Sequence, residues 1–417
     1  MDVDSLLAPA AGALLAEVMQ VPDTPAAQLA AGTRLRRRFP AGLVAAAFAQ
    51  AGLRRRAATK FDRWERMWFT ADGLEQASAE PLARHRARRF DGADRVVDLC
   101  SGIGGDLLAL AEGRAALAVD RDPQVLRLAV RNAEVYEVAG AISTAVADVG
   151  DVALDGAVFV DPARRRAGRR LPAGTSEPSL GWCLELATRV PHVTIKAAPG
   201  LPRDRVPAGW ELEFVALGTA LKEAVLWSPA WSGSRRRASV LPATAAGRRL
   251  APPAAELTGD GSETVPVGDP GAYLLDPNPA VTRAGLVGAL GARLGARQID
   301  PEIAFLCTDA PVRTPFARLL RIDDSRPWHL ADLTREIRRR EIGGLDLRRR
   351  GLAGDVEDLR RRLRPRGPHR ATLVMTRRGD RPWALLCSEP DPDPHPHPDP
   401  HPNPDPHPDP HPDPHPE

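Results

Sequence analysis

A glycine-rich run holds the residues whose types and spacing are best suited to binding a ligand. Residues 98–106 read Asp-Leu-Cys-Ser-Gly-Ile-Gly-Gly-Asp and follow an apolar run that predicts a buried strand. Because glycine has no Cβ atom, its backbone N–H group can approach a ligand closely. A helix beginning near Gly105 would also direct its positive end toward a carboxylate or a phosphate. We expect five residues of this run to bind a cofactor: Asp98, Ser101, Gly102, Gly104 and Gly105.

Acidic residues close the next predicted strands. Asp120 stands 22 residues after Asp98, at a position where a carboxylate can accept both hydroxyls of a ribose. Asp148 follows the third strand, where it can accept a hydrogen bond from an adenine amino group. Asp161 and Pro162 form a stiff corner at the carboxyl end of the fourth strand, the edge at which open α/β sheets bind ligands. We expect this corner to act in catalysis by orienting the acceptor.

Arginines follow this corner at once. Arg164, Arg165 and Arg166 come directly after Ala163, and guanidinium groups bind phosphate oxygens in a bidentate geometry. We therefore predict that these three arginines bind the substrate. The high arginine content of the whole chain is the competing explanation for such a cluster.

The elements that must position these residues alternate between strands and helices. The predicted strands and helices of this region are, in chain order, 96–100, 105–112, 117–119, 122–138, 142–147, 158–160, 180–188 and 193–195. Such alternation is typical of a parallel sheet with helices on both faces. The segments 210–216 and 224–227 instead predict an antiparallel pair. Residues 1–60 and 62–90 are predicted to be helical.

Charge and composition narrow the class of protein. Eight of the 54 acidic residues lie from Glu389 onward, where Lys and Arg are absent, so residues 1–388 carry 57 basic and 46 acidic side chains. The resulting net charge of +11 favours a nucleic-acid partner. The longest apolar stretch, 41–53, is too short for a membrane span, and the first residues lack the basic region of a secretory signal. Four scattered cysteines support no zinc ribbon or disulfide framework. We expect a soluble, cytoplasmic protein.

The remainder of the chain changes character twice. Residues 231–300 predict a linker with a small subdomain: about 228–270 is rich in Pro, Gly and Ala and holds two short strand candidates, and 278–294 resembles a helix. Residues 301–388 predict a second unit of helices and strands. Residues 389–417 alternate Pro with Asp, His, Asn or Glu, a pattern typical of an extended, disordered tail. Its histidines and carboxylates can bind Zn²⁺, Ni²⁺ or Cu²⁺ weakly. We predict no metal ligands in the folded part.

Several of these motifs together resemble a known family. In order and at typical spacing, motifs I to IV of class I S-adenosylmethionine (SAM)-dependent methyltransferases are matched by Asp98–Asp106, Asp120, Asp148 and Asp161-Pro162. Residues 69–78 and the glycine run are similar to the trimethylguanosine-synthase-like group. Arg349-Arg350-Gly351 and Leu363–Pro368, before a predicted strand at 371–375, resemble the THUMP-like domain attached to a bacterial branch of that group.

The resemblance implies a fold, a cofactor and a substrate class. The fold would be α/β: a Rossmann-like, seven-stranded class I methyltransferase core with a helical N-terminal segment and a C-terminal α+β THUMP-like domain. The glycine loop and the three strand-end aspartates would hold SAM. Because THUMP modules are associated with RNA, the reaction implied is methyl transfer to RNA. The domains, in order, would be the helical segment 1–60, the methyltransferase domain 61–230, the linker and subdomain 231–300, the THUMP-like domain 301–388 and the tail 389–417.

The acceptor atom stays open between a base nitrogen and a ribose 2′-oxygen. Amine-methylating members commonly continue the Asp-Pro corner with proline and an aromatic ring that stacks on the base. Here Ala163 and Arg164 follow instead, so a stacking ring would have to come from Trp182, Trp227 or Trp231.

Four residues support the ribose alternative. Lys60, Asp161, Lys196 and Glu223 occur in the order of the Lys-Asp-Lys-Glu tetrad of ribose 2′-O-methyltransferases. In such a set, a lysine of lowered pKa acts as the base that activates the hydroxyl, and the carboxylates hold it in place. Chance placement of surface lysines is the competing explanation.

Other functional classes share some of these features. An NAD-dependent oxidoreductase would also use the glycine loop and Asp120, but its GxGxxG fingerprint would need a glycine at Leu107. A non-catalytic RNA-binding protein with a vestigial pocket would keep the basic charge. A methyltransferase of small molecules or proteins is a further alternative, because one core serves many acceptors.

Overall fold

The chain forms two units. The computed structural model describes residues 7, 9–163, 165–166, 169–170, 175–243, 253–352 and 355–390. The first unit comprises Met1–Pro266 and Pro277–Ala296, and the second comprises Val267–Asp276 and Arg297–Glu417. The segment 231–300, which we expected to be a linker with its own subdomain, is therefore divided between the two units. The predicted tail and its histidines lie outside the described residues, apart from Glu389 and Pro390.

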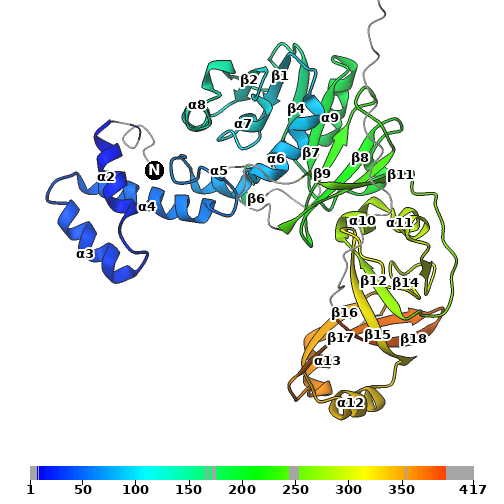
Figure 1. The fold of residues 1–417 in the computed structure, drawn as a ribbon. Coiled ribbons are helices and arrows are strands. Elements are labelled where there is room, and N and C mark those ends of the chain that lie inside the picture. Colours follow the sequence, from blue (N-terminus) through cyan, green and yellow to red (C-terminus); the bar gives the residue numbers. More distant parts are fainter. Residues whose placement is uncertain are drawn as a thin grey trace, which may run out of the picture. The chain divides into compact units, whose positions relative to one another are not determined.

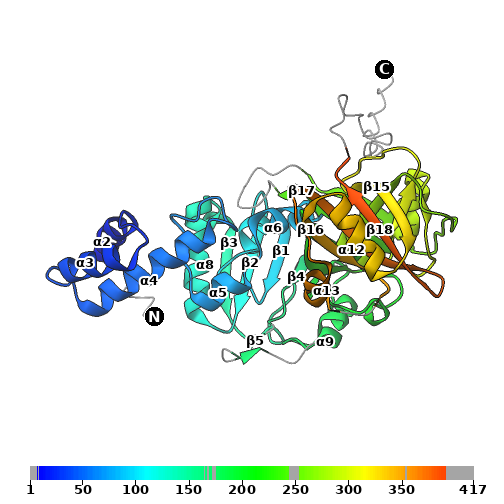
Figure 2. The same cartoon turned by 90° about the horizontal axis from the view of Figure 1, so that it is seen from below.

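The first unit begins with helices, as predicted. They are α2 (Pro9–Met19), α3 (Pro25–Leu35) and α4 (Ala41–Ala57) (Figure 2). Thr24 caps α3 by accepting a hydrogen bond from the backbone N–H of Ala27, and buried Leu14, Leu35 and Val44 pack the three helices together. The last turn of α4 packs into a second cluster, which also contains residues next to the glycine run. In 62–90, where we predicted continuous helix, only α5 (Ala71–Gln76), α6 (Glu80–Ala87) and a short 3₁₀ turn form.

A nine-stranded sheet follows, in the order β11-β10-β8-β9-β7-β4-β1-β2-β3 (Figure 1). Five neighbouring strands pair in parallel: β1 (Arg95–Leu99), β2 (Ala115–Asp120), β3 (Ile142–Val146), β4 (Ala157–Val160) and β7 (Val193–Ala197). Strands β8 (Glu211–Leu217) and β9 (Ala220–Trp227) form the predicted antiparallel pair, with β9 also antiparallel to β7. All four residues of β4 are buried, which is typical of a strand covered on both faces.

The sheet is wider than the seven strands that we predicted. Strands β10 (Arg236–Leu241) and β11 (Ala255–Gly259) extend it beyond β8, and both come from the segment predicted to be a linker. Four consecutive buried residues end β10. The sequence offered two short strand candidates in this segment, but it did not predict that they join the main sheet. The helices α10 (Pro279–Ala284) and α11 (Val287–Leu294) also belong to this unit.

Short helices connect the parallel strands. They are α7 (Leu107–Leu110), α8 (Pro123–Tyr136) and α9 (Leu180–Glu185). Asp122 caps α8 by accepting from the N–H of Gln124, and Pro123 occupies its first turn, as favoured there. The helix predicted over 105–112 is limited to α7, because residues 101–106 form the turns of the glycine loop. Residues of α6, α7 and α8 pack with β1, β2 and β4 in one buried cluster.

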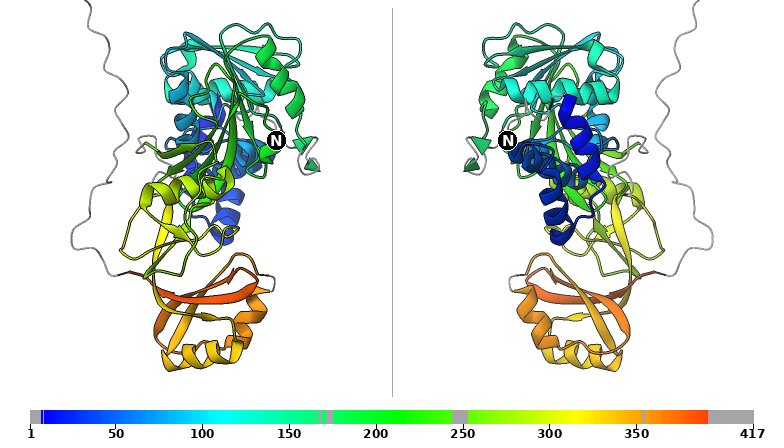
Figure 3. Two further views of the ribbon diagram at one scale, coloured as in Figure 1. Left: turned by 90° about the vertical axis from the view of Figure 1, so that its right-hand side faces the viewer. Right: turned by 90° about the vertical axis from the view of Figure 1, so that its left-hand side faces the viewer.

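The second unit is an α+β domain, shown in Figure 3. Its sheet has the order β13-β14-β12-β15-β18-β17-β16. The strands are β12 (Tyr273–Pro277), β13 (Arg297–Gln298), β14 (Leu306–Thr308), β15 (Ala317–Pro327), β16 (Ile342–Arg349), β17 (His369–Arg378) and β18 (Arg381–Ser388). Helices α12 (Leu330–Arg339) and α13 (Val356–Leu363) bury Leu333 and Leu363 against β16 and β17.

The described ranges lack two features that would bear on function. Within them, no helix has the length and apolar character needed to cross a lipid bilayer. The same ranges contain no group of three or more His, Cys, Asp or Glu side chains placed to hold a metal ion.

Candidate active site

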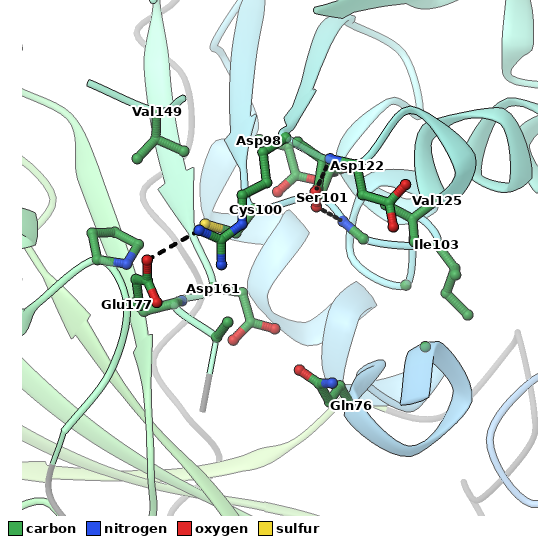
Figure 4. A pocket seen from close by; sticks show the side chains of 18 of the residues that line it. Gln76, Asp98, Cys100, Ser101, Ile103, Asp122, Val125, Val149, Asp161 and Glu177 are labelled. Atoms are coloured by element: carbon green, nitrogen blue, oxygen red, sulfur yellow. Dashed lines mark hydrogen bonds and ion pairs between the residues drawn. The ribbon is translucent and has the colours of Figure 1, made fainter. Parts of the chain in front are cut away.

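A cavity of about 740 Å³ lies at the carboxyl ends of β1, β2 and β4 (Figure 4). The loop after each of these strands contributes to its wall, as expected for the ligand-binding edge of a parallel sheet. Eight of the predicted cofactor and acceptor residues line it: Asp98, Ser101, Gly102, Gly105, Asp120, Asp148, Asp161 and Pro162. The structure thus brings together residues from four separate stretches of the sequence.

The loop after β1 is held in an unusual backbone conformation. Cys100, Gly102 and Gly104 all have positive φ, at 62°, 55° and 89°. The N–H of Ser101 donates to the carbonyl of Val119, 3.0 Å away, and the N–H of Gly102 donates to Oδ2 of Asp120 at 2.9 Å. These hydrogen bonds hold the glycine loop against the end of β2, so the loop and Asp120 lie side by side at the same edge of the sheet.

The glycines of the loop have different roles. A Cβ atom on Gly102 would meet nothing within 4 Å, whereas one on Gly104 would lie 3.3 Å from Cβ of Ala129 in α8. A Cβ atom on Gly105 would approach Cβ of Ala77 to 3.0 Å. Gly104 is not among the residues that line the cavity, so its contact with the cofactor stays a prediction. Its glycine is required by positive φ and by close packing.

Asp98 is a buried carboxylate with an unsatisfied oxygen. Its exposed fraction is 1%. Ser101 Oγ donates to Oδ2 at 2.8 Å, but Oδ1 has no hydrogen-bond partner. Burial raises the pKa of Asp98 well above its usual value, and the neighbouring carboxylates of Asp106 and Asp161 raise it further. A buried acceptor without a donor is costly, so this oxygen is suited to a ligand that brings a cationic donor.

Asp120 and Asp148 can accept further hydrogen bonds from a ligand. Asp120 accepts from the N–H of Gly102 and from the N–H of Asp122, one bond on each oxygen. An ionised carboxylate offers about four acceptor positions, so about two remain for ribose hydroxyls. Asp148 is exposed and accepts from the N–H of Gly150 at 3.0 Å, which leaves it available at the rim.

Another part of the cavity wall is formed by the corner after β4, where we predicted that the acceptor is oriented. The N–H of Asp161 donates to the carbonyl of Leu99 at 3.2 Å, and Figure 4 shows its carboxylate pointing into the cavity. Lys196, at the end of β7, donates from Nζ to Oδ2 of Asp161 at 2.6 Å. Lys196 is buried and does not line the cavity, so it contacts Asp161 from the protein side and not from the cavity.

The four residues of the predicted lysine tetrad are not assembled as a set. Lys60 donates from Nζ to the carbonyls of Leu74, Glu75 and Ala77 at 2.7, 3.0 and 2.8 Å and so holds the end of α5. Burial, and then the charge of Lys196, lower the pKa of Lys60 from 10.5 to about 8. Glu223 forms an ion pair with the buried Arg86. Only Asp161 and Lys196 make the contact that the tetrad requires.

Two further predictions have different outcomes. Arg164 lies outside the described residues, and Arg165 and Arg166 form the short strand β5 (Arg165–Arg166), which pairs with β6 (Arg169–Arg170); their phosphate contacts stay a prediction. Of the three tryptophans considered as stacking rings, Trp182 lines the cavity. Trp227 is fully buried, and Trp231 packs against Phe90 and His192.

Sequence reasoning missed the wall that precedes the core. Thr70, Gly73, Gln76 and Ala77 line the cavity, although they lie before β1. In the sequence, residues 69–78 indicated only a family resemblance, and we did not predict that they line the cavity. An ion pair was also missed: Arg121 donates from Nη1 to Oε1 of Glu177 at 3.0 Å, and both residues line the cavity. No spacing rule connects them, because the residues between them do not form a regular repeat.

The lining suits the cofactor that the resemblance implied. Acidic side chains line the cavity at eight positions: Asp72, Asp98, Asp106, Asp120, Asp122, Asp148, Asp161 and Glu177. Such a lining favours a ligand with positive charge, and SAM carries a sulfonium and an ammonium group. The open acceptor of Asp98 and the remaining acceptor positions of Asp120 match the donors of that molecule.

Family models match three parts of the chain. Residues 93–237 match the model of RNA cap guanine-N2 methyltransferases, and residues 317–389 match the THUMP domain-like model. Residues 1–57 match a domain of unknown function. These matches confirm the resemblance to the trimethylguanosine-synthase-like group and to THUMP-like domains.

Relatives of known sequence and structure agree with this assignment. Proteins from two strains of Mycobacterium tuberculosis, CDC 1551 and H37Rv, are each 36% identical over 341 residues, which cover 78% of this chain and 91% of the relative; both are described as uncharacterized SAM-dependent methyltransferases. A crystal structure from Porphyromonas gingivalis W83, provisionally described as a methyltransferase, has the same fold, with a TM-score of 0.69 at 20% identity over 90% of this chain and 97% of the other. The chain belongs to the family of S-adenosylmethionine-dependent methyltransferases.

Proposed function

We propose that this methyltransferase transfers the methyl group of SAM to a nitrogen atom of a base in RNA. The proposal draws its substrate class from the match of one chain to both an RNA cap guanine-N2 methyltransferase model and a THUMP domain-like model. The observation that carries the choice of atom is the position of Asp161, which lines the cavity on its acceptor side and is held by Lys196.

Asp161 suits an amine acceptor. Bound SAM supplies an electrophilic methyl group on a positively charged sulfur. A nitrogen nucleophile gains positive charge as it is methylated and must then lose a proton. Lys196 occupies one of the roughly four acceptor positions of the Asp161 carboxylate, so others can accept N–H groups of the base. A fixed carboxylate near developing positive charge lowers the barrier electrostatically.

The environment of Lys60 and Glu223 argues against a ribose hydroxyl as acceptor. A 2′-oxygen needs a base that removes its proton during the reaction. Lys60 has the lowered pKa that this role requires, but its Nζ is engaged by three backbone carbonyls. Glu223 is 3% exposed and paired with Arg86. Trp182 on the cavity wall further supports a base, since an aromatic ring can stack on one.

The charge of the two units suggests how RNA is held. The acidic lining of the cavity would repel phosphate, so only the base should enter, as in enzymes that flip a base out of its stack. Phosphates would then bind to exposed arginines elsewhere. In the second unit, α13 and the loop after it expose several: Arg360, Arg361, Arg362, Arg364 and Arg366. Guanidinium contacts of this kind position the backbone without reading sequence.

The test is methyl transfer from labelled SAM to fractionated bacterial RNA and to unmodified transcripts, followed by digestion and mass spectrometry of the nucleosides. We expect a base methylated on nitrogen, and loss of transfer in Asp161→Ala. Transfer in which the label is found as a 2′-O-methyl nucleoside would refute the choice of atom. Transfer to protein or small molecules in the same extract, with RNA unlabelled, would refute the substrate class.

A further inference from the structure

We propose that Ser78 is a positioning residue that fixes Lys196, and through it Asp161, at the acceptor side of the cavity. The inference rests on the proposed function only in the role given there to Asp161. Its observation is a buried hydrogen-bond network that joins the segment before the core to the end of β7.

The hydroxyl of Ser78 is the centre of this network. Lys196 donates from Nζ to Ser78 Oγ at 2.7 Å, and Arg86 donates from Nη2 to the same oxygen at 2.8 Å. Ser78 donates in turn to Oδ2 of Asp106 at 2.8 Å. A hydroxyl has one donor and two acceptor positions. All three are therefore used, and the direction of each hydrogen bond is fixed.

The network is buried, touches the cavity through Asp106, and is balanced by charge. Ser78, Arg86, Asp106 and Lys196 are each buried. Arg86 forms ion pairs with Asp106 and Glu223. Although burial raises it, these cations hold the pKa of Asp106 below its usual value. Apart from Nε of Arg86, which has no partner, the polar atoms described here are bonded, and such a buried network favours a single arrangement of its side chains.

Lys196 has few other ways to be held. Its Nζ lies 2.6 Å from Asp161 Oδ2, 2.7 Å from Ser78 Oγ and 3.8 Å from Asp106 Oδ2. Without the Ser78 hydroxyl, the ammonium would be drawn toward Asp106, which lies beyond hydrogen-bond distance at present. That movement would pull Lys196 away from Asp161. Asp161 would then lose its orientation, although the cofactor loop would be unchanged.

The segment that carries Ser78 gives this network a second consequence. Gln76 and Ala77 line the cavity, and Lys60 holds this segment through its three carbonyl contacts. The N–H of Glu80, two residues later, donates to the carbonyl of Lys60 at 2.8 Å. The position of Ser78 therefore depends on Lys60, in the turn after α4, as well as on its partners in the sheet. The acceptor corner is coupled to an element outside the methyltransferase core.

The chain contains only three lysines, Lys60, Lys196 and Lys222, which makes a direct test possible. In protein labelled with ¹⁵N-lysine, the three side-chain ammonium signals can be observed separately, and Lys222→Arg assigns the exposed one. We expect Ser78→Ala and Asp161→Asn each to shift the Lys196 signal, while the Lys222 signal stays in place. An unchanged Lys196 signal in Ser78→Ala would overturn the proposal, whatever the substrate.

Kinetics provide the second readout. We expect Ser78→Ala to lower kcat about tenfold, the effect of losing one hydrogen bond to a charged group, with an unchanged Kd for SAM. Ser78→Thr keeps the hydroxyl and should restore both kcat and the Lys196 signal. Ser78→Cys has a similar shape but a weak donor, and it replaces Ser78→Ala if the alanine variant does not fold. If the wild-type protein left RNA unmethylated, the proposed function would fail, and the lysine signals would still decide the role of Ser78.

Discussion

Replacing Asp98 by asparagine tests the cofactor side of the cavity. Asparagine has nearly the shape of aspartate and can still accept a hydrogen bond from Ser101, as Oδ2 of Asp98 does now. It cannot carry the negative charge that a cationic ligand would meet at Oδ1, the buried oxygen without a partner. We expect Asp98→Asn to fold and to bind SAM much more weakly.

The magnitude follows from the charge on the hydrogen bond that asparagine cannot provide. A hydrogen bond to a charged group contributes about 1.5–3 kcal/mol, and each 1.4 kcal/mol changes Kd about tenfold. We therefore expect the Kd for SAM to rise by about ten- to a hundred-fold. Asp148 provides a matched control, because it lines the same cavity but is exposed. Asp148→Asn should raise Kd only a few-fold.

The dependence on pH gives the sign of a second effect. The pKa of Asp98 is raised in the folded protein, mainly by burial and then by Asp106. A cationic ligand prefers the ionised carboxylate, so binding below this pKa must release a proton. Affinity for SAM should therefore rise as the pH rises toward the pKa. A raised folded pKa also means that Asp98 destabilises the fold once it is ionised, so ligand-free Asp98→Asn should be at least as stable as the wild type.

Titration calorimetry in buffers of different ionisation enthalpy measures both effects. We expect proton release on SAM binding to the wild type and none in Asp98→Asn. Thermal denaturation without ligand checks the stability of the variant. An Asp98→Asn protein that bound SAM with wild-type affinity and the same proton release would refute the assignment of Asp98 as the cofactor acceptor.

Two further predictions concern the residues that support the site. Gly104→Ala should lower the free energy of unfolding by about 1–3 kcal/mol, because the residue combines a positive φ with a Cβ position 3.3 Å from Ala129. The control is Gly102→Ala, at φ 55° in open space, which should lower it by about 1 kcal/mol. Equal losses for the two variants in urea unfolding would contradict the role of packing at Gly104. Lys60→Met should also destabilise the protein, since three carbonyls lose their donor. Because the folded pKa of Lys60 is lowered from 10.5 to about 8, the folded state binds fewer protons than the unfolded state between those two values. The stability of the wild type relative to Lys60→Met should thus rise with pH across that window, and a flat difference would show that Lys60 does not titrate there.

The residues that sequence reasoning located best are those at strand ends. Asp120 and Asp161 each end an apolar run and Asp148 follows the more polar strand 142–146, and parallel strands bring their carboxyl ends to one edge. Their meeting in one cavity could therefore be predicted from order alone. The strands of the core were predicted for the same reason, since buried parallel strands read as continuous apolar runs.

The parts that could not be predicted depend on contacts between distant segments. Lys60 and Glu223 fit a tetrad by order, but sequence order does not say that backbone carbonyls and Arg86 take those side chains. The sequence did not show that Gly104 packs closely against Ala129, because that contact joins the glycine loop to a helix that comes later in the chain. Two short strand candidates were predicted where β10 and β11 lie, but they were assigned to a separate subdomain because the proline and glycine around them are typical of linkers. Only the pairing of β10 with β8 shows that they extend the main sheet.

The wall formed by Thr70, Gly73, Gln76 and Ala77 has a consequence for where the enzyme begins. The family match starts at residue 93, after every one of these residues. A fragment trimmed to that match would keep the strands and the glycine loop, but one side of its cavity would be open to solvent. The smallest catalytic fragment of this chain must therefore begin at or before Lys60, because the hydrogen bonds of Lys60 to the end of α5 hold this wall of the cavity in place.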